Sequence, residues 1–186
     1  HQEGLTFDKG VFEELLVKSS FDFSDIQKNL AFLKGYKTEG NISSQDIMEA
    51  IPKSLQDNIF DMTQLLLRGQ IQDVRELVHD LRLQGEDEIK LIAVMLGQFR
   101  TYLQVKLLSA QGKSEQQIVS SLSDYPSRKV NPFQVRYAIR DSRHLSVAFL
   151  KTTIKTLVET DYQIKTGTLD KDYLLDLALL KIASNS

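Results

Sequence analysis

Cysteine is absent from this 186-residue sequence, and proline and glycine occur only three and nine times. Without cysteine the chain can form no disulfide framework, no thiolate metal site and no cysteine nucleophile. No apolar run approaches the roughly 18 residues that a membrane-spanning helix needs, and the N-terminus lacks the basic-then-apolar layout of a signal peptide. These absences indicate a cytoplasmic protein with no membrane partner.

Catalytic motifs are lacking as well. A phosphate-binding loop requires a glycine-rich turn followed by Lys-Ser or Lys-Thr, and the nearest string, Lys165–Gly167, has the wrong order. The histidines His1, His79 and His144 have neither the i, i+4 spacing nor the accompanying carboxylates of a metal site. We therefore expect no enzyme activity, no catalytic residue, no metal and no cofactor.

The composition that is present is ordinary for a globular protein, with 41% hydrophobic residues, 26% charged residues and a net charge of -2. A chain of this length can form one domain or two small ones around a core. A start at His1 rather than at Met suggests a fragment whose N-terminal part has been removed.

Apolar residues recur with helical spacing nearly throughout, which predicts an all-α fold. Three short helices are expected within residues 1–51. Asp8 and Ser24 are the predicted caps of the first two, and Ser43 with Asp46 forms the capping signature of the third.

The polar segment 52–57, which opens with Pro52, is the candidate linker. It separates the predicted domains, residues 1–55 and residues 56–186. Beyond it the predicted helices are longer, and their apolar stripes cover residues 58–69, 71–81, 87–110, 114–122, 132–139, 146–164 and the stretch from 170 onward.

Four segments in a fixed order carry a family resemblance. They are residues 58–70 (NIFDMTQLLLRGQ), 96–106 (LGQFRTYLQVK), 132–138 (PFQVRYA) and 161–167 (DYQIKTG). No single segment is specific. Their succession over almost the whole chain resembles the C-terminal half of the delta subunit of bacterial DNA polymerase III, which belongs to the sliding-clamp loader.

The resemblance implies an architecture and a set of partners. Residues 1–55 would be an AAA+ lid that lacks its first helix, and residues 56–186 a helical collar domain. In the family the collars of several subunits pack into a ring, so the expected partners are the motor and delta prime subunits and, in the full assembly, primer-template DNA. The sliding clamp would be contacted only through an N-terminal domain that this sequence does not contain. The implied role is non-catalytic support of clamp loading during DNA replication.

One cluster of basic residues could bind nucleic acid. The sequence between Pro126 and Leu145 contains five cations and a single acid, Asp141. Clustered cations raise the affinity of a protein for phosphates. A helical DNA-binding regulator is therefore the alternative function. Nine residues separate Leu122 from Pro132, whereas a helix-turn-helix joins its helices by about three or four. The cations of this cluster are Arg128, Lys129, Arg136, Arg140 and Arg143.

A second candidate contact lies at the end of the fourth segment. Asp161 and Lys165 have the spacing of an ion pair on a helix, and Thr166 with Gly167 predicts the end of that helix. Because the family's collar lies above the primer-template DNA, the resemblance implies that Lys165 contacts a phosphate, with Thr166 beside it.

Some apolar residues do not fit the stripes expected to pack inside the chain. Phe60, Leu66 and Tyr102 are of this kind. We expect them at the interface with neighbouring collars, which in the family is heterologous.

Overall fold

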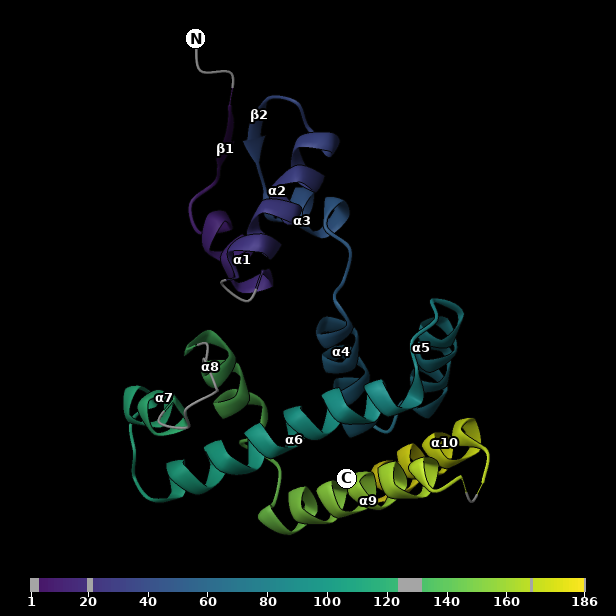
Figure 1. Cartoon of the computed structure of the whole chain (residues 1–186). Coiled ribbons are helices and arrows are strands. Elements are labelled where there is room, and N and C mark those ends of the chain that lie inside the picture. The colour runs from purple at the N-terminus through teal and green to yellow at the C-terminus, as the bar shows by residue number, and fades with distance from the viewer. Residues whose placement is uncertain (1–3, 20–21, 124–131, 168, 186) are drawn as a thin grey trace. The chain divides into compact units, whose positions relative to one another are not determined.

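In the computed structural model, the described residues are 4–19, 22–123, 132–167 and 169–185 (Figure 1). They form ten helices and one two-stranded sheet, so the predicted helical fold is confirmed, with a small sheet in addition. The chain divides into two compact units, His1–Lys53 and Ser54–Ser186. We call them the first and the second unit.

The first unit packs three short helices and a parallel strand pair around a small core. Residues Leu5 and Phe7 of one strand lie opposite Gly40 and Ile42 of the other. This pair was not predicted. The elements in chain order are β1 (Leu5–Phe7), α1 (Val11–Lys18), α2 (Phe23–Tyr36), β2 (Gly40–Ile42) and α3 (Ser44–Ala50).

Two of the predicted caps in this unit are wrong. Gly10, with φ 86°, precedes α1, and the Asp8 carboxylate instead accepts a hydrogen bond from the Asn41 side chain. Asp22 rather than Ser24 caps α2, because the extended backbone at Asp22 directs its carboxylate to the free N–H groups of Ser24 and Asp25, 2.9 and 3.2 Å away.

The predicted capping box of the third helix is confirmed. The Ser43 hydroxyl accepts from the backbone N–H of Asp46, and the Asp46 carboxylate accepts from the backbone N–H of Ser43. Ser54 and Asp57 repeat the same arrangement at the start of the second unit. Helix α7 (Glu115–Ser123) begins with a similar reciprocal pair, in which Gln117 Oε1 accepts from the Ser114 N–H and Ser114 Oγ accepts from the Gln117 N–H.

The second unit consists of helices alone. Each helix predicted beyond residue 57 is present, although the first begins at Leu55. The elements are α4 (Leu55–Leu67), α5 (Ile71–Leu83), α6 (Glu88–Ala110), α7 (Glu115–Ser123), α8 (Pro132–Asp141), α9 (Val147–Lys165) and α10 (Lys171–Ser184).

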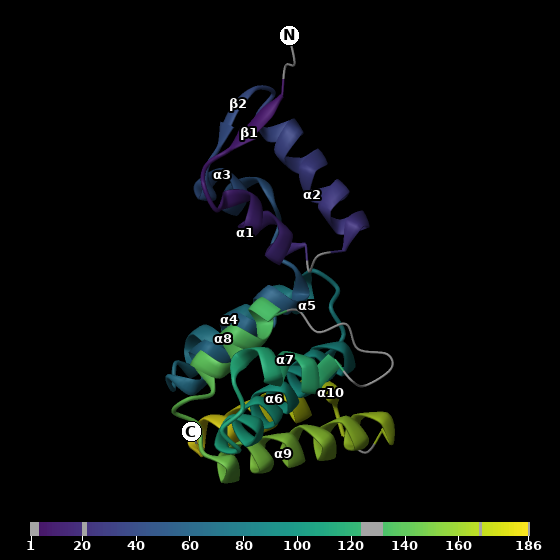
Figure 2. The same cartoon turned by 90° about the vertical axis from the view of Figure 1, so that its left-hand side faces the viewer.

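Helix α6 organises the second unit. Its 23 residues extend over about 35 Å at 1.5 Å per residue. Helix α9 packs along it, α4 and α5 lie toward its N-terminal end, and α7 and α8 lie toward its C-terminal end (Figures 1 and 2). The Phe99 side chain is fully buried and makes edge-to-face contacts with the rings of Tyr102 and Phe149, at 6.0 and 6.5 Å between centroids.

A network of charged side chains fastens α10 to the start of α6. Glu88 lies at its centre with its side chain only 3% exposed. Its two carboxylate oxygens accept from Arg82 of α5 at 2.9 Å and from Lys171 of α10 at 2.9 Å. Lys171 also contacts Asp87 at 2.8 Å, and Arg82 contacts Asp176 at 3.2 Å. Three helices thus share one set of ion pairs.

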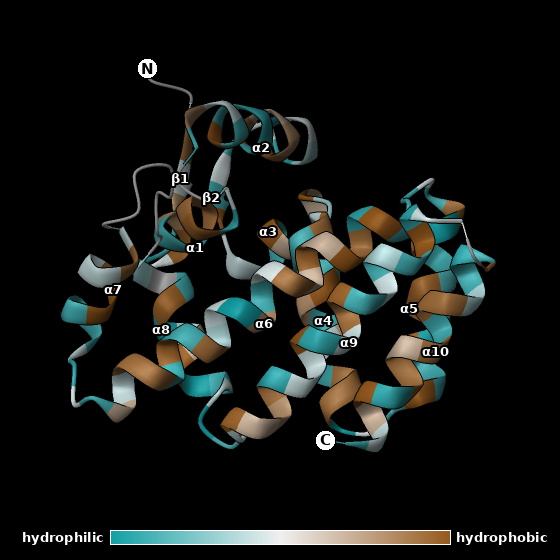
Figure 3. Cartoon of the chain, turned by 60° about the horizontal axis from the view of Figure 1, so that its bottom comes forward, coloured by the Kyte–Doolittle hydropathy of each residue, from teal (hydrophilic) through white to brown (hydrophobic). Residues whose placement is uncertain are grey.

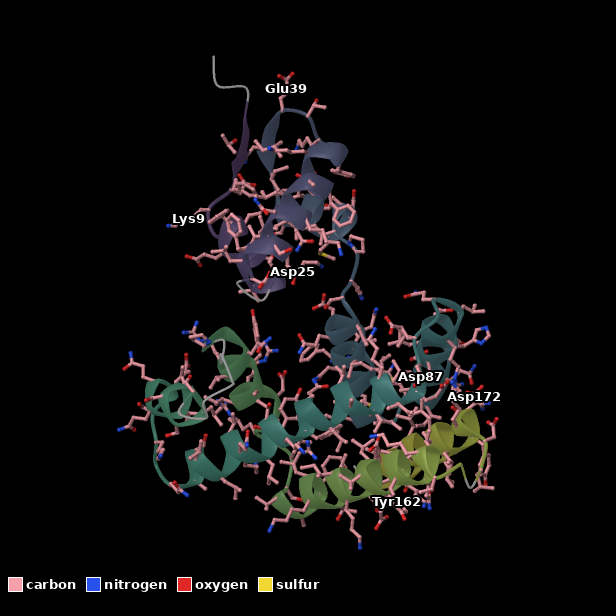
Figure 4. The ribbon with its side chains drawn as sticks, viewed as in Figure 1. Lys9, Asp25, Glu39, Asp87, Tyr162 and Asp172 are labelled. Carbon is pink, nitrogen blue, oxygen red and sulfur yellow. The ribbon has the colours of Figure 1, made fainter. Side chains whose placement is uncertain are left out.

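The network keeps Glu88 ionised. Burial alone would raise its pKa, but the hydrogen bonds from Lys171, from the backbone and from neighbouring side chains outweigh burial and lower the pKa to about 2. The hydrogen bond to Glu88 raises the pKa of Asp172 in turn. Figure 4 places Asp87 and Asp172 at the same end of the second unit.

Candidate functional site

The C-terminal end of α9 contains Lys165, the candidate DNA contact of the fourth segment. Lys165 Nζ lies 2.7 Å from Asp161 Oδ2, which confirms the predicted ion pair. Thr166 ends α9, and its hydroxyl donates to the Tyr162 carbonyl at 2.9 Å. Gly167 follows with φ 67°, a backbone conformation that glycine adopts without strain. The C-terminal end of α9 is therefore held by local hydrogen bonds.

The C-terminal end of α9 exposes a cation and an aromatic ring. The side chain of Lys165 is 55% exposed, and Tyr162, one turn earlier, is 69% exposed and points away from the unit (Figure 4). An exposed ion pair is weak, so Lys165 can exchange Asp161 for a phosphate oxygen at little cost. The Thr166 hydroxyl is already bonded to the backbone, which makes it the poorer contact of the two.

Helix α8 carries Arg136 and Arg140 of the basic cluster, both of which have acidic neighbours, and Arg143 lies just after the end of α8. Arg136 Nη2 lies 3.0 Å from Glu115 Oε1 of α7, and Arg140 Nε lies 2.8 Å from Asp141 Oδ1. The Arg140 guanidinium also lies 5.1 Å from the centroid of the Tyr137 ring. Both arginine side chains are about two-thirds exposed, at 65% and 64%. Arg128 and Lys129 lie outside the described residues.

The connection between α7 and α8 differs from that of a helix-turn-helix. The two helices pack against each other, but residues 124–131 separate them, against the three or four residues that join the helices of that motif. Val135 and Ala138 bury one side of α8 in the core of the unit. The arginines therefore form an exposed, partly neutralised surface rather than a groove-reading helix of that type.

The three residues expected at a subunit interface behave differently from one another. Leu66 is fully buried and Tyr102 is 3% exposed, both within the second unit itself, so the expectation that they do not pack inside the chain is wrong. Helix α6 packs against α4, α8 and α9, and α4 packs against α5, α6 and α10, so side chains that lie off a single stripe of either helix are buried as well. Phe60 is only partly buried.

Tyr102 belongs to a hydrogen-bonded chain that links α4 to α6. The Gln98 amide donates to its hydroxyl at 2.8 Å, and the Thr63 hydroxyl donates to the Gln98 amide oxygen at 2.9 Å. Burial raises the pKa of Tyr102 to about 12. Apolar spacing alone does not identify Thr63 and Gln98. Gln98 is a polar residue four positions before Tyr102 on the same helix, and that spacing could have predicted its hydrogen bond.

No group of three or more acidic or histidine side chains that could hold a metal ion occurs in the described ranges. None of the described helices is both long and apolar enough to cross a membrane.

Residues 56–182 match the sequence family described as the C-terminal domain of the DNA polymerase III delta subunit. The chain belongs to the DNA polymerase III delta subunit family. The match covers nearly the whole second unit, and it includes all four segments on which the resemblance was based.

A curated sequence and a solved structure of delta protein from Bacillus subtilis are similar to this chain. DNA polymerase III subunit delta of strain 168 is 35% identical over 160 residues, which cover 86% of this chain and 44% of that protein. The solved structure of the DNA clamp loader delta protein has a TM-score of 0.82 at 30% identity, and the match covers 96% of this chain and 51% of that one. The chain thus spans about half the length of the delta proteins that it matches.

Proposed function

We propose that this chain is a non-catalytic part of a bacterial replicative clamp loader and that its second unit is the collar through which a delta subunit joins the other loader subunits. The observation that carries the proposal is the family match over residues 56–182, which coincides with one compact unit that has its own core. A domain used for assembly needs a stable fold and an accessible surface, and the second unit offers both.

The first unit is proposed to be the part of an AAA+ lid that remains in this chain. It has three short helices and a separate core, which fits a small helical domain connected by a linker. The parallel strand pair β1–β2 is an addition to the three-helix pattern that the resemblance implied. Clamp contact is assigned to no residue of either unit.

Motor subunits and a delta prime subunit are the proposed protein partners. Phe60 remains a candidate interface residue, because its side chain is only partly buried. Primer-template DNA is the proposed ligand of the assembled loader. Lys165 is the preferred contact because its ammonium group is exposed and its ion pair is weak. Arg136 and Arg140 are further candidates, because their side chains are also exposed, although each, like Lys165, is paired with an acid.

Co-purification with the other loader subunits tests this proposal. We expect the chain to form a stable complex with the motor and delta prime subunits, and we expect residues 54–186 alone to suffice. A truncated chain that gives a folded circular dichroism spectrum and a cooperative melt, yet fails to join the complex, contradicts the collar assignment. We also expect no ATP binding by the isolated chain, and micromolar affinity by calorimetry contradicts that part.

The alternative, a helical DNA-binding regulator, has one observation in its favour. Arg136 and Arg140 are exposed on α8, and Tyr137 beside them is 42% exposed. Such a regulator binds duplex DNA by itself, with an affinity that falls steeply as salt rises. An assembly module binds DNA weakly when isolated. Fluorescence anisotropy of a labelled duplex at two salt concentrations separates the two functions.

A further inference from the structure

The two arginines of α8 are bound by their acidic neighbours in different ways. Arg136 uses two nitrogens of its guanidinium group, because its Nε and Nη2 lie 3.1 and 3.0 Å from Glu115 Oε1. Arg140 uses Nε alone, which donates to Asp141 Oδ1 at 2.8 Å. Neither Nη group of Arg140 has a hydrogen-bond partner among the described residues. The end of its planar fork is therefore open.

Asp141 is a fixed base for the guanidinium group of Arg140. Its side chain is only 8% exposed, and its second oxygen, Oδ2, is buried without a hydrogen-bond partner in the described part of the chain. Loss of Arg140 would leave a buried charge uncompensated, which is costly, so the pair is expected to persist. Helical spacing alone does not produce this pair, since adjacent residues of a helix point about 100° apart and do not face each other.

Two further contacts restrict the guanidinium group and the end of the helix that carries it. Arg140 Cζ lies 5.1 Å from the centroid of the Tyr137 ring, within the range of a cation–π contact. Lys106 of α6 donates to the carbonyl groups of Ser142 and Arg143 at 3.1 and 3.0 Å, directly after α8. Arg140 therefore loses little conformational freedom when a ligand binds, which favours affinity.

The open fork lies on the solvent side of α8. Helical spacing places Arg136, Tyr137 and Arg140 on the side opposite the buried Val135 and Ala138. The side chain of Arg140 is 64% exposed. In Figure 3 the ribbon of α8 has both hydrophilic and hydrophobic stretches, as a helix with one buried side should. A ligand can therefore reach the Nη groups without any unfolding of α8.

The open groups define the chemistry of the ligand. The Nη groups only donate hydrogen bonds, and the guanidinium group is planar and permanently charged, so it matches an anion with two acceptor oxygens. Phosphates and carboxylates both have this form. Residues 132–145 contain three arginines and a single acid, and the nearest of these arginines, Arg143, is exposed as well. A nucleic-acid backbone has a phosphate at every nucleotide and can contact several such cations, whereas a single carboxylate of a protein cannot.

We propose that Arg140 binds a backbone phosphate of DNA through its two Nη groups, with Asp141 and Tyr137 as the residues that position its guanidinium group. The inference rests on the proposed function, because it takes primer-template DNA as the ligand of the assembled loader and assigns one contact within it. Asp141 and Tyr137 act through the guanidinium group and not on the DNA.

Substitution of each arginine tests the inference in the reconstituted loader, with primer-template DNA as the probe. Arg140→Ala should weaken DNA binding about tenfold, because charge-assisted hydrogen bonds are lost. It should also make the salt dependence shallower by about one phosphate contact. Arg136→Ala is the matched control, since it removes the same charge from the same helix but from a fork that Glu115 already engages. The control should weaken binding by less than about threefold.

Two further variants separate positioning from charge. Asp141→Ala removes a negative charge, so DNA affinity should rise if charge alone governs binding. We expect it to fall by about threefold to tenfold, because the freed guanidinium group must be ordered on binding. Asp141→Asn should restore most of the affinity, since its amide oxygen still accepts from Nε. Arg140→Lys keeps the charge without the fork and should stay weak. It leaves the core untouched, so it tests the fork even if Asp141→Ala is unstable.

Fluorescence anisotropy at several salt concentrations gives the DNA affinities, and thermal melts show which variants are folded. If Arg140→Ala binds DNA as well as Arg136→Ala does, or if Arg140→Lys restores full affinity, the fork assignment is wrong and the proposed function stands. Tighter DNA binding by a folded Asp141→Ala variant overturns the positioning role. If Arg140→Ala weakens association with the other subunits and leaves DNA affinity unchanged, the ligand is a protein carboxylate and the inference is wrong. If the unmodified chain joins no loader, the proposed function itself fails.

Discussion

The two units differ in how much core they have. The described part of the first unit buries six apolar residues in its core cluster, and the second unit buries 23 in its own. The first unit is also the smaller, at His1–Lys53 against Ser54–Ser186. A domain of about 60 residues buries a smaller fraction of its surface than a larger one and is correspondingly marginal. The first unit therefore depends more on caps and local hydrogen bonds than the second does.

The largest expected effect comes from the core of the second unit. Phe99→Ala removes a fully buried ring that contacts two other rings, and the loss of burial plus the cavity should cost about 3–5 kcal/mol. Thermal unfolding followed by circular dichroism should show a large drop in the main transition.

Leu33→Ala is the counterpart in the first unit, since Leu33 is fully buried in the smaller core. It should remove the tertiary structure of that unit while the second unit keeps its melting temperature. If amide spectra of the two variants show both units unfolding together, the units are not independent and the comparison fails.

The next effect is the pH dependence that Glu88 contributes to the stability of the second unit. The pKa of Glu88 is about 2 in the folded chain, below its ordinary 4.5, so the ionised form favours folding. This contribution, about 3 kcal/mol at 1.36 kcal/mol per pKa unit, is complete above pH 4.5 and is lost as the pH falls toward 2. The raised pKa of Asp172 acts in the opposite direction and offsets a part of it.

Urea unfolding at pH 6, 4 and 3 measures the contribution of Glu88 to stability. Glu88→Gln should reduce the amount by which the free energy of unfolding of the second unit falls between pH 6 and pH 3. The unfolding of the first unit should not respond to the substitution. If the free energy of unfolding falls equally at low pH in Glu88→Gln and in the unmodified chain, the pH dependence belongs to other carboxylates.

A smaller effect is expected when a capping box is removed from either unit. Ser43→Ala and Ser54→Ala each remove one capping box, and each should cost about 1 kcal/mol. The loss is the larger fraction of total stability in the unit with the smaller core. Hydrogen exchange should therefore show more extensive opening around α3 in Ser43→Ala than around α4 in Ser54→Ala. Equal exchange in the two variants argues that the units have similar stability.

The smallest expected change in stability belongs to Lys165→Ala. Loss of an exposed helical ion pair costs about 0.3–0.5 kcal/mol, so the melting temperature of the second unit should fall by no more than about 1–2 °C. In the assembled loader the same variant should bind primer-template DNA more weakly and with a slightly shallower salt dependence, because one phosphate contact is lost. A large loss of stability with unchanged DNA binding removes Lys165 from the proposed contact.

Local signals predicted most of the second unit. Asp87, Ser146 and Asp170, at which three of the predicted stripes begin, are the caps of α6, α9 and α10, because a cap and the apolar spacing that follows it lie within a few residues. The Lys165–Asp161 pair was predictable for the same reason. The Arg136–Glu115 pair was not, since its members lie 21 positions apart in the sequence and only the packing of α7 on α8 brings them together.

The errors share a physical cause, which is competition that only tertiary structure decides. Asp22 and Ser24 are both good caps two residues apart, and the backbone conformation selects Asp22. Leu66 and Tyr102 lie off the predicted stripes, but α4 and α6 each pack against several other helices, and both side chains are buried. Strands β1 and β2 are three residues long, too short for an alternating pattern to identify them.

The parallel pairing of β1 with β2 also has a consequence for the order of folding. Leu5 lies opposite Gly40, and closing a loop of about 35 residues costs on the order of 3 kcal/mol of chain entropy before any hydrogen bond of the strand pair offsets it. Helices α1 and α2, which lie within that loop, shorten the distance once they form. The strand pair therefore belongs late in folding, after its crossover helices, whereas the turn from α9 to α10 brings its two helices together early.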